Sequence, residues 1–424
     1  MSDRTFDQNQ IETLQQAVHD TVQKTPLTDI HTHLYAPQFG GLLLAGVDEL
    51  LTYHYLVAEY FRVSQTAPET FFSWEKPAQA AAIWQALFLE RSPVSEACRG
   101  VVTALGRLGA PVAGKDLEAI RAWYAAMTTE QLVDRVFEAA NVRDVVMTND
   151  PFDSAENPVW LGKDGPGEVD PRFHTALRID PLVNDWPNCT SALEARGYQV
   201  SEIVDAMCVN ELQRFLNDWI DILNPRYLAV SLPPDFVYPA EDVRTCVIDK
   251  AIVPVTAARN IPFALMIGVK RGVNPALQLA GDGVDKADLS SVEALCRRYP
   301  KNKFMLTTLS RENQHTACVI ARKFRNLLLF GCWWFLNNPS LIGEMTRMRI
   351  ELLGTSIIPQ HSDCRVLDQL VYKWAHSRAI IAQVLAEKYT DLVHAGWTIE
   401  ESQMRTEIEN MLGGNFWRFL EARF

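Results

Sequence analysis

The sequence predicts an α/β fold, a distorted (β/α)8 TIM barrel with a helical insertion after strand 1. Three observations favour this fold: short, mostly apolar runs recur along the chain, helical stretches separate them, and one long stretch without strands follows the first run. Buried strands that alternate with helices are typical of a parallel sheet. Eight such runs favour a closed barrel over an open sheet. They cover residues 27–34, 144–150, 174–182, 227–234, 262–269, 303–310, 327–335 and 354–363.

The long stretch at residues 36–142 contains helical patterns, such as VDELLTYHYLVAEYFR and SPVSEACRGVVTALGRL, and no convincing strand. We expect it to form a helical insertion over the C-terminal mouth of the barrel, where loops of this fold carry function. Residues 1–35 then supply an N-terminal helix, predicted at residues 6–24, and the first strand. Residues 143–424 supply the remainder of the barrel and the C-terminal helices.

The composition excludes several classes of protein. With 48% hydrophobic and 22% charged residues, the 424-residue chain is ordinary for a globular protein. Lys and Arg number 40 against 52 Asp and Glu, so the net charge of −12 disfavours binding to nucleic acid. The eight cysteines are scattered and indicate reduced thiols. Because no secretory signal and no membrane-spanning run is visible, we expect a cytoplasmic protein without a membrane partner.

Polar side chains occur at the C-terminal end of nearly every predicted strand. In a (β/α)8 barrel these ends surround the active site, so the residues are candidates for catalysis or binding. A barrel that served only as a scaffold would not need polar groups at so many of these positions. The candidates are His31, His33, Asn149, Asp150, Arg178, Asp180, Ser231, Lys270, Ser310, Arg311, Trp333, Trp334, His361, Asp363 and Arg365.

His31 and His33 are two residues apart on a predicted strand, so both imidazoles project to the same face. Two imidazoles near a carboxylate can hold a divalent metal ion such as zinc. Asp363 is the natural third ligand because the eighth strand of a closed barrel lies beside the first. An isolated His-x-His is also compatible with a chance pair or a hydrogen-bonded interior pair. The position of the motif at a strand end favours the metal site.

Several segments of the chain resemble the uronate isomerases of the amidohydrolase superfamily. The resemblance extends from about residue 26 to residue 420, nearly the whole chain. The histidine–tyrosine pair in the insertion and the aspartate of the last strand make it specific. The matching segments are LTDIHTHL, DELLTYHYLVAEYFR, RSPVSEACRGV, VMTNDPFD, ALRIDPL, FGCWWFLNNP and IPQHSDCR.

The resemblance implies an aldose–ketose isomerisation through an enediol, of D-glucuronate to D-fructuronate and of D-galacturonate to D-tagaturonate. His31, His33 and Asp363 match the metal ligands of the family. We therefore expect one divalent metal ion, zinc by the ligand types, which this small ligand set would bind weakly. The expected partner is a small-molecule hexuronate, and the sequence leaves a homo-oligomer open, as it does the choice between the two hexuronates.

Tyr55, His54, Arg178 and Arg365 match family residues around the sugar acid. Isomerisation removes a proton from carbon 2 and returns one to carbon 1. A carboxylate near a metal suits the base, and a phenol can transfer protons between the two oxygens. Asp363, Tyr55 and His54 are therefore the predicted catalytic residues, and either Asp363 or Tyr55 is the main proton-transfer group.

The carboxylate of the substrate requires a cation, and the planar fork of an arginine matches it geometrically. The sequence does not decide between Arg178 and Arg365. Arg178 lies in an apolar strand, where its charge needs a partner, and a nearby aspartate is a structural alternative. Trp333 and Trp334 are predicted to contribute a stacking surface for the sugar. Adjacent residues of a strand point to opposite faces, so at most one of the two faces the site.

Two other functions are compatible with parts of this pattern. A metal-dependent hydrolase or decarboxylase of another small carboxylate would use the same barrel, but hydrolases of the superfamily carry further metal ligands on the middle strands. Here those strand ends carry Ser231, Lys270 and Ser310. This disfavours hydrolysis but leaves decarboxylation open. A catalytically silent sugar-acid binding protein would not need His31, His33, Asp363 and Tyr55 together.

Overall fold

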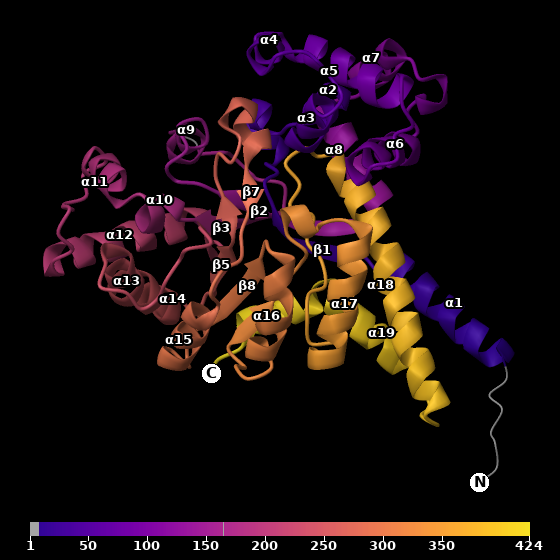
Figure 1. Ribbon diagram of the computed structural model, residues 1–424. Coiled ribbons are helices and arrows are strands. Elements are labelled where there is room, and N and C mark those ends of the chain that lie inside the picture. Colours follow the sequence, from indigo (N-terminus) through magenta and orange to yellow (C-terminus); the bar gives the residue numbers. More distant parts are fainter. Residues whose placement is uncertain (1–7, 164) are drawn as a thin grey trace.

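The computed structural model describes residues 8–163 and 165–424. Seven parallel strands form one curled sheet in the order β1-β2-β3-β4-β5-β8-β9, with helices packed around it (Figure 1). The predicted α/β barrel is therefore confirmed. The strands are β1 Leu27–Thr32, β2 Val142–Asn149, β3 Phe173–Arg178, β4 Leu228–Leu232, β5 Phe263–Ile267, β8 Phe304–Thr308 and β9 Leu327–Leu329.

The eighth position of the barrel is filled by residues 357–364 without a regular strand. One parallel bridge joins Ile358 to Phe330, and Asp363 donates its backbone N–H to the carbonyl of His31 at 3.2 Å. The predicted strand 354–363 is therefore wrong in length. Pro359 has no N–H to donate, and the side chain of Gln360 accepts hydrogen bonds from two backbone N–H groups that would otherwise belong to a ladder.

The strands are almost completely buried on both faces, as expected for a parallel sheet covered by helices. β9 ends at Leu329, so the predicted strand 327–335 is also too long. A short antiparallel pair that the sequence did not reveal lies between β5 and β8. It consists of β6 Val269–Lys270 and β7 Gly283–Val284, joined by the 3-10 segment η5 Pro275–Gly281.

Helices and no regular strand connect β1 to β2, as predicted, with one isolated bridge at Leu44. Those from α2 to α7 lie above the C-terminal end of the barrel (Figure 1). The last, α8, packs against α18 and β2; its start is fixed by a capping box between Thr128 and Gln131. The domain boundaries at residues 36 and 142 stay predictions. The connecting helices are α2 Val47–Leu51, α3 His54–Phe61, α4 Pro68–Phe72, α5 Lys76–Trp84, α6 Glu96–Leu108, α7 Leu117–Ala125 and α8 Thr129–Ala140.

The remaining helices surround the barrel. The long helix α18 follows the irregular eighth segment and packs against α1, α6, α8 and α17. The helices from α9 to α18 are α9 Asn157–Leu161, α10 Asp180–Asn184, α11 Trp186–Glu194, α12 Ala206–Leu223, α13 Val243–Val247, α14 Val253–Arg259, α15 Ser290–Arg298, α16 Gln314–Ala321, α17 Pro339–Leu353 and α18 Gln369–His394.

Helices at the beginning and at the end of the described chain pack against the barrel. Helix α1 (Gln8–Lys24) is described from Gln8, so the predicted start at Phe6 lies outside the described residues. At the C-terminus α19 (Glu401–Glu409) and α20 (Asn415–Glu421) follow α18. Phe416 of α20 is fully buried and packs with Tyr227 against the lower end of the barrel interior.

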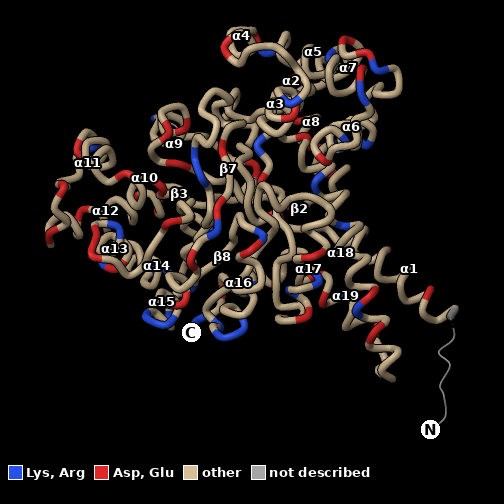
Figure 2. Tube along the Cα trace, in the orientation of Figure 1, with Lys and Arg blue, Asp and Glu red and all other residues tan. Residues whose placement is uncertain are grey.

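Charged residues of both signs are spread over the outer helices, and basic residues gather where α15 and α16 end (Figure 2). Cations at a helix C-terminus are favoured by the helix dipole. All eight cysteines are free. None of the helices in residues 8–163 and 165–424 is long and apolar enough to cross a membrane.

The close contact between α6 and α18 provides a test of the packing. A Cβ atom at Gly100 would lie 2.6 Å from the ring of Tyr372, whereas a Cβ at Gly106 of the same helix would meet nothing within 4 Å. We expect Gly100→Ala to lower the free energy of unfolding by about 1–3 kcal/mol through overpacking. Gly106→Ala, the control, should raise it by up to about 1 kcal/mol. Urea unfolding measures both, and equal effects would contradict this packing.

Candidate active site

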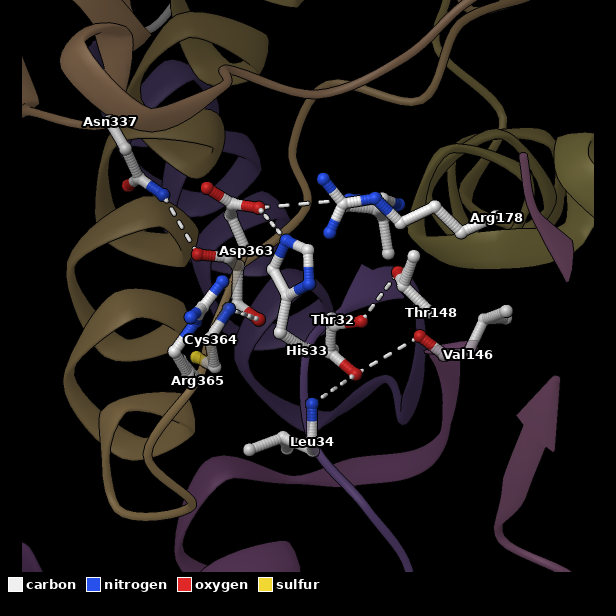
Figure 3. A network of polar contacts seen from close by, with 12 residues as sticks. Thr32, His33, Leu34, Val146, Thr148, Arg178, Asn337, Asp363, Cys364 and Arg365 are labelled. Atoms are coloured by element: carbon white, nitrogen blue, oxygen red, sulfur yellow. Dashed lines mark hydrogen bonds and ion pairs between the residues drawn. The ribbon is translucent and has the colours of Figure 1, made fainter. Parts of the chain in front are cut away.

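Two histidines and one aspartate meet at the C-terminal end of the barrel. His31 lies in β1 and His33 directly follows that strand, so both rings project to one face. Asp363 comes from the irregular segment beside β1. Its Oδ1 lies 3.7 Å from Nε2 of His31 and 3.4 Å from Nε2 of His33. Figure 3 shows His33 and Asp363 facing each other. The structure thus brings together the three residues that the sequence predicted as ligands.

These three residues fit a divalent cation. Within the described part of the chain they form a group in which one ligand atom from each lies within 4.8 Å of the others. Nε2 of His31 and Oδ1 of Asp363 are buried and accept no hydrogen bond from any described residue. Buried polar atoms are normally hydrogen bonded. Nitrogen and carboxylate lone pairs that converge without donors therefore indicate a cation site.

The tautomer of His31 is determined by Tyr227, which directly precedes β4. The Tyr227 hydroxyl donates its single proton to the carbonyl of Ile30 at 2.8 Å. It therefore accepts a hydrogen bond from Nδ1–H of His31 at 2.9 Å, which leaves the lone pair on Nε2. Burial also lowers the pKa of His31 well below its ordinary value, so the ring is neutral. This is the state in which a histidine binds a metal.

Asp363 adopts an unusual backbone conformation with φ of 53°, in the left-handed region. Aspartate tolerates this region better than most residues, but at some energetic cost. Burial alone would raise the pKa of the Asp363 carboxyl; the close approach of His33, whose Nε2 lies 3.4 Å from Oδ1, and then the electrostatic influence of the neighbouring imidazoles outweigh burial and lower it. The carboxyl is therefore ionised at neutral pH and available as a ligand or as a base.

Two arginines lie near this group and differ in their partners. Arg178, at the end of β3, donates two hydrogen bonds to Oδ2 of Asp180, at 3.0 and 2.6 Å. Figure 3 shows its side chain extending toward His33 and Asp363. Arg365 is half-buried, and among the described residues its guanidinium makes no hydrogen bond or ion pair, although its backbone N–H does. Arg365 is therefore the arginine whose fork is free for an anion.

Tyr55 and His54 reach the site from the insertion, in the first turn of α3. The Tyr55 hydroxyl and Nε2 of His54 are both buried and have no hydrogen-bond partner among the described residues. Burial raises the pKa of Tyr55 well above its ordinary value, so the phenol stays protonated. Burial, followed by the charge of Arg365, lowers the pKa of His54 to about 3, so its ring is neutral.

The two tryptophans have different surroundings. Trp333 is 4% exposed and packs in the barrel interior with Met266 and Leu309. Trp334 has φ of 43° and lies with its ring centroid 5.2 Å from that of His54. Its buried indole Nε1 has no partner in the described chain. The two residues do not lie on a strand, so the predicted alternation of faces does not apply to them; Trp334 is the one that lies beside His54.

A cavity of about 400 Å³ is lined by two of the candidate site residues, His54 and Arg365. His54, Tyr53 and Arg365 line one side, and Leu277 and Gln278 of η5 line another. The segment η5 also packs against α3. The segment η5, which joins β6 to β7, therefore lies across a cavity from His54 and Arg365, a position that the sequence did not indicate.

The sequence did not indicate the importance of three buried polar residues, Tyr227, His361 and Lys373. The sequence pattern places His361 only at a strand end; in the structure it is fully buried, and neither ring nitrogen has a partner among the described residues. A Cβ at Gly331 would lie 1.7 Å from its Nδ1, so only glycine leaves room for the ring. Lys373 is 2% exposed in α18. A polar residue within an apolar run was the available signal for Tyr227 and Lys373.

The chain is similar to solved isomerases. It shares 52% sequence identity with a uronate isomerase from Bacillus halodurans C-125, with 97% of each chain covered and a TM-score of 0.95. A uronate isomerase from Thermotoga maritima has the same fold, at 15% identity over 96% of this chain and 97% of that chain and a TM-score of 0.76. So does a glucuronate isomerase from Caulobacter crescentus, at 13% identity over 99% and 96% and a TM-score of 0.75. Comparison with protein-family models and with curated proteins gives no match.

The hydrogen bond from His31 to Tyr227 predicts a defined effect on metal binding. Tyr227→Phe removes the acceptor for Nδ1–H of His31, so the proton of the ring is no longer held on Nδ1. We therefore expect the affinity for Zn²⁺ to fall about 10- to 100-fold. Tyr389→Phe is the control, because Tyr389 is also buried but its hydroxyl donates to Glu407, away from the site. Competition with a chromophoric chelator measures both affinities. Equal affinities in the two variants would contradict this role of Tyr227.

Proposed function

This chain belongs to the uronate isomerase family and is an isomerase, and from that premise we propose that it converts D-glucuronate to D-fructuronate, D-galacturonate to D-tagaturonate, or both. The observation that carries the proposal is 52% identity over 97% of the chain to a uronate isomerase, in a chain that gathers His31, His33 and Asp363 at one point. The ends of β4 and β8 carry Ser231 and Ser310. Neither residue type supplies a typical ligand for a second metal ion, which favours isomerisation over metal-dependent hydrolysis.

We propose that His31, His33 and Asp363 hold one zinc ion. Two imidazole nitrogens and a carboxylate oxygen are ligands that zinc accepts. Among the described residues three ligands converge, so we expect the ion to exchange readily. When bound, such an ion orients the substrate oxygens and stabilises negative charge that develops on them.

Asp363 is the proposed base. Its carboxyl is ionised, and a carboxylate oxygen that is not engaged as a ligand can accept the proton from carbon 2. Tyr55, which its raised pKa keeps protonated, can donate a hydrogen bond or a proton to a substrate oxygen and recover it from the other. The neutral His54 beside it can exchange hydrogen bonds with a hydroxyl group. The division of proton transfer between Asp363 and Tyr55 is decided by the first experiment below.

The substrate carboxylate is proposed to bind Arg365. Its guanidinium has no acidic partner among the described residues, whereas Asp180 already occupies the fork of Arg178. A bidentate pair with a carboxylate is the strongest contact that either arginine can offer. Arg178 then contributes positive charge near the site, and Trp334 offers an indole face and an unpaired N–H beside His54.

The remaining features of the function are proposals as well. The proposed ligand is a small hexuronate, with no nucleic-acid or membrane partner, and the proposed location is the cytoplasm, in keeping with eight free cysteines. A homo-oligomer is compatible with this function and is not required by the site, since one chain supplies every residue named above.

Incubation with each hexuronate tests the function directly. The wild-type protein should form the ketose product and exchange the carbon 2 proton with solvent deuterium. Asp363→Asn retains a carbonyl oxygen for the metal but cannot accept a proton, so its kcat should fall by about 10²–10⁴-fold. The assay is run at saturating Zn²⁺. A near wild-type rate would show that Asp363 is only a ligand and make Tyr55 the base; no ketose from wild-type enzyme would overturn the function and favour decarboxylation or binding alone.

The choice of arginine predicts different effects of two matched substitutions. Arg365→Lys keeps the charge but loses the fork, so KM for the hexuronate should rise about tenfold or more. Arg178→Lys loses the two hydrogen bonds to Asp180. It should lower the thermal midpoint more than Arg365→Lys does and raise KM less than Arg365→Lys does. Steady-state kinetics and thermal unfolding of both variants decide the matter. The reverse pattern would assign substrate binding to Arg178.

A further inference from the structure

The peptide bond between Ser362 and Asp363 is held at both of its polar groups. Its carbonyl accepts hydrogen bonds from Nζ of Lys373 at 2.6 Å and from Nδ2 of Asn337 at 3.2 Å; Figure 3 shows the contact from Asn337. Its N–H, which belongs to Asp363, donates to the carbonyl of His31 at 3.2 Å. The angle φ at Asp363 is measured from the plane of this peptide, so these three contacts help to hold the left-handed conformation described above.

The preceding peptide is fixed as well. The backbone N–H of Ser362 donates to both carboxylate oxygens of Asp29, at 3.1 and 3.3 Å. Asp29 also accepts a hydrogen bond from the indole of Trp374 at 2.8 Å. Asp29 and Ser362 are fully buried. The backbone before Asp363 therefore lies between a buried anion on one side and a buried cation on the other.

Lys373 is the member of this arrangement whose presence needs an explanation. It is 2% exposed and pairs with no carboxylate among the described residues. Its Nζ contacts the Ser362 carbonyl and lies 5.4 Å from the ring centroid of Tyr55. Burial of an ammonium without an ion pair is unfavourable. Both of its neighbours belong to the site, which indicates that the lysine serves the site and not the packing of α18.

We propose that Lys373 is a positioning residue, which holds the Ser362–Asp363 peptide so that the Asp363 carboxylate points at His31 and His33. Without the ammonium, the carbonyl would keep only the longer bond from Asn337, and Asp363 could relax out of the left-handed region toward conformations more favourable for an L-residue. The carboxylate would then leave the point where the three ligand atoms converge. The part of this inference that concerns turnover rests on the proposed isomerase function; the part that concerns metal binding does not.

The test compares Lys373→Met with Lys303→Met in the full-length protein. Lys303 is an equally buried lysine, 2% exposed, whose Nζ also donates to a backbone carbonyl, that of Leu420. It precedes β8 and so lies at the opposite end of the barrel from the site. Comparison of the two variants therefore separates the effect of losing any buried ammonium group from the effect of losing the ammonium of Lys373.

We expect Zn²⁺ affinity, measured by competition with a chromophoric chelator, to be about 10- to 100-fold lower in Lys373→Met than in Lys303→Met. Equal affinities in the two variants would overturn the proposal whatever the activities are. If Lys373→Met does not fold, as judged by thermal unfolding, Lys373→Gln and Lys303→Gln are compared in the same way. Hexuronate turnover at saturating Zn²⁺ is measured in parallel. A wild-type protein without turnover would refute the isomerase function and leave the affinity comparison decisive for Lys373.

Discussion

Residues 357–364 complete the barrel and also carry the carboxylate of the site. The arrangement of the site depends on the irregular backbone of this segment, which does not form a regular strand. A regular strand would place its side chains alternately inside and outside the barrel. Here side chains take the place of the ladder on both sides: Asp29 of β1 accepts the N–H of Ser362, and Gln360 of the segment itself accepts the N–H of Cys332. The backbone is thereby free to turn at Asp363 and direct its carboxylate across to β1.

The same constraint explains why charged groups lie in the interior near the site. Asp29, Lys373 and Arg349 are each almost fully inaccessible to solvent. Burial raises the pKa of Asp29 to about 6, although its hydrogen bonds from Ser362 and Trp374 oppose this. Arg349 donates to the carbonyl of Gly331 at 2.8 Å, at the position where His361 approaches the backbone. Each charge is thus bound to irregular backbone, where no strand supplies the hydrogen bonds.

The helical insertion is joined to the site through the residues that follow Asp363. Leu44 forms a parallel bridge with Val366. Asp368 accepts hydrogen bonds from the N–H of Gly46 at 2.9 Å and from the hydroxyl of Tyr124 at 2.5 Å. The segment that positions the carboxylate therefore also anchors the insertion, which supplies Tyr55 and His54. The proposed catalytic groups of the barrel and of the insertion are held relative to one another by a few residues of the chain.

The sequence by itself determined the parts of this protein that depend on local periodicity. Apolar runs predicted the parallel strands, and the spacing of His31 and His33 predicted that both rings share a face, because alternation along a strand follows from backbone geometry. It also indicated that Asp363 would lie near them, given a closed barrel. The lengths of the last two strands were wrong, because Gly331 and Pro359 interrupt regular pairing in ways that apolar character does not reveal.

Only the tertiary structure decided which groups are free to act. The partner of His31 is Tyr227, 196 residues away. The choice between Arg178 and Arg365 depends on whether an aspartate already occupies the guanidinium, and the role of Lys373 depends on a carbonyl presented by another segment. Hydrogen bonds of this kind form between side chains and backbone that the fold brings together, and no pattern within a few residues of either partner specifies them. The chemistry of the ligands is therefore readable in the sequence, whereas their orientation is a property of the closed barrel.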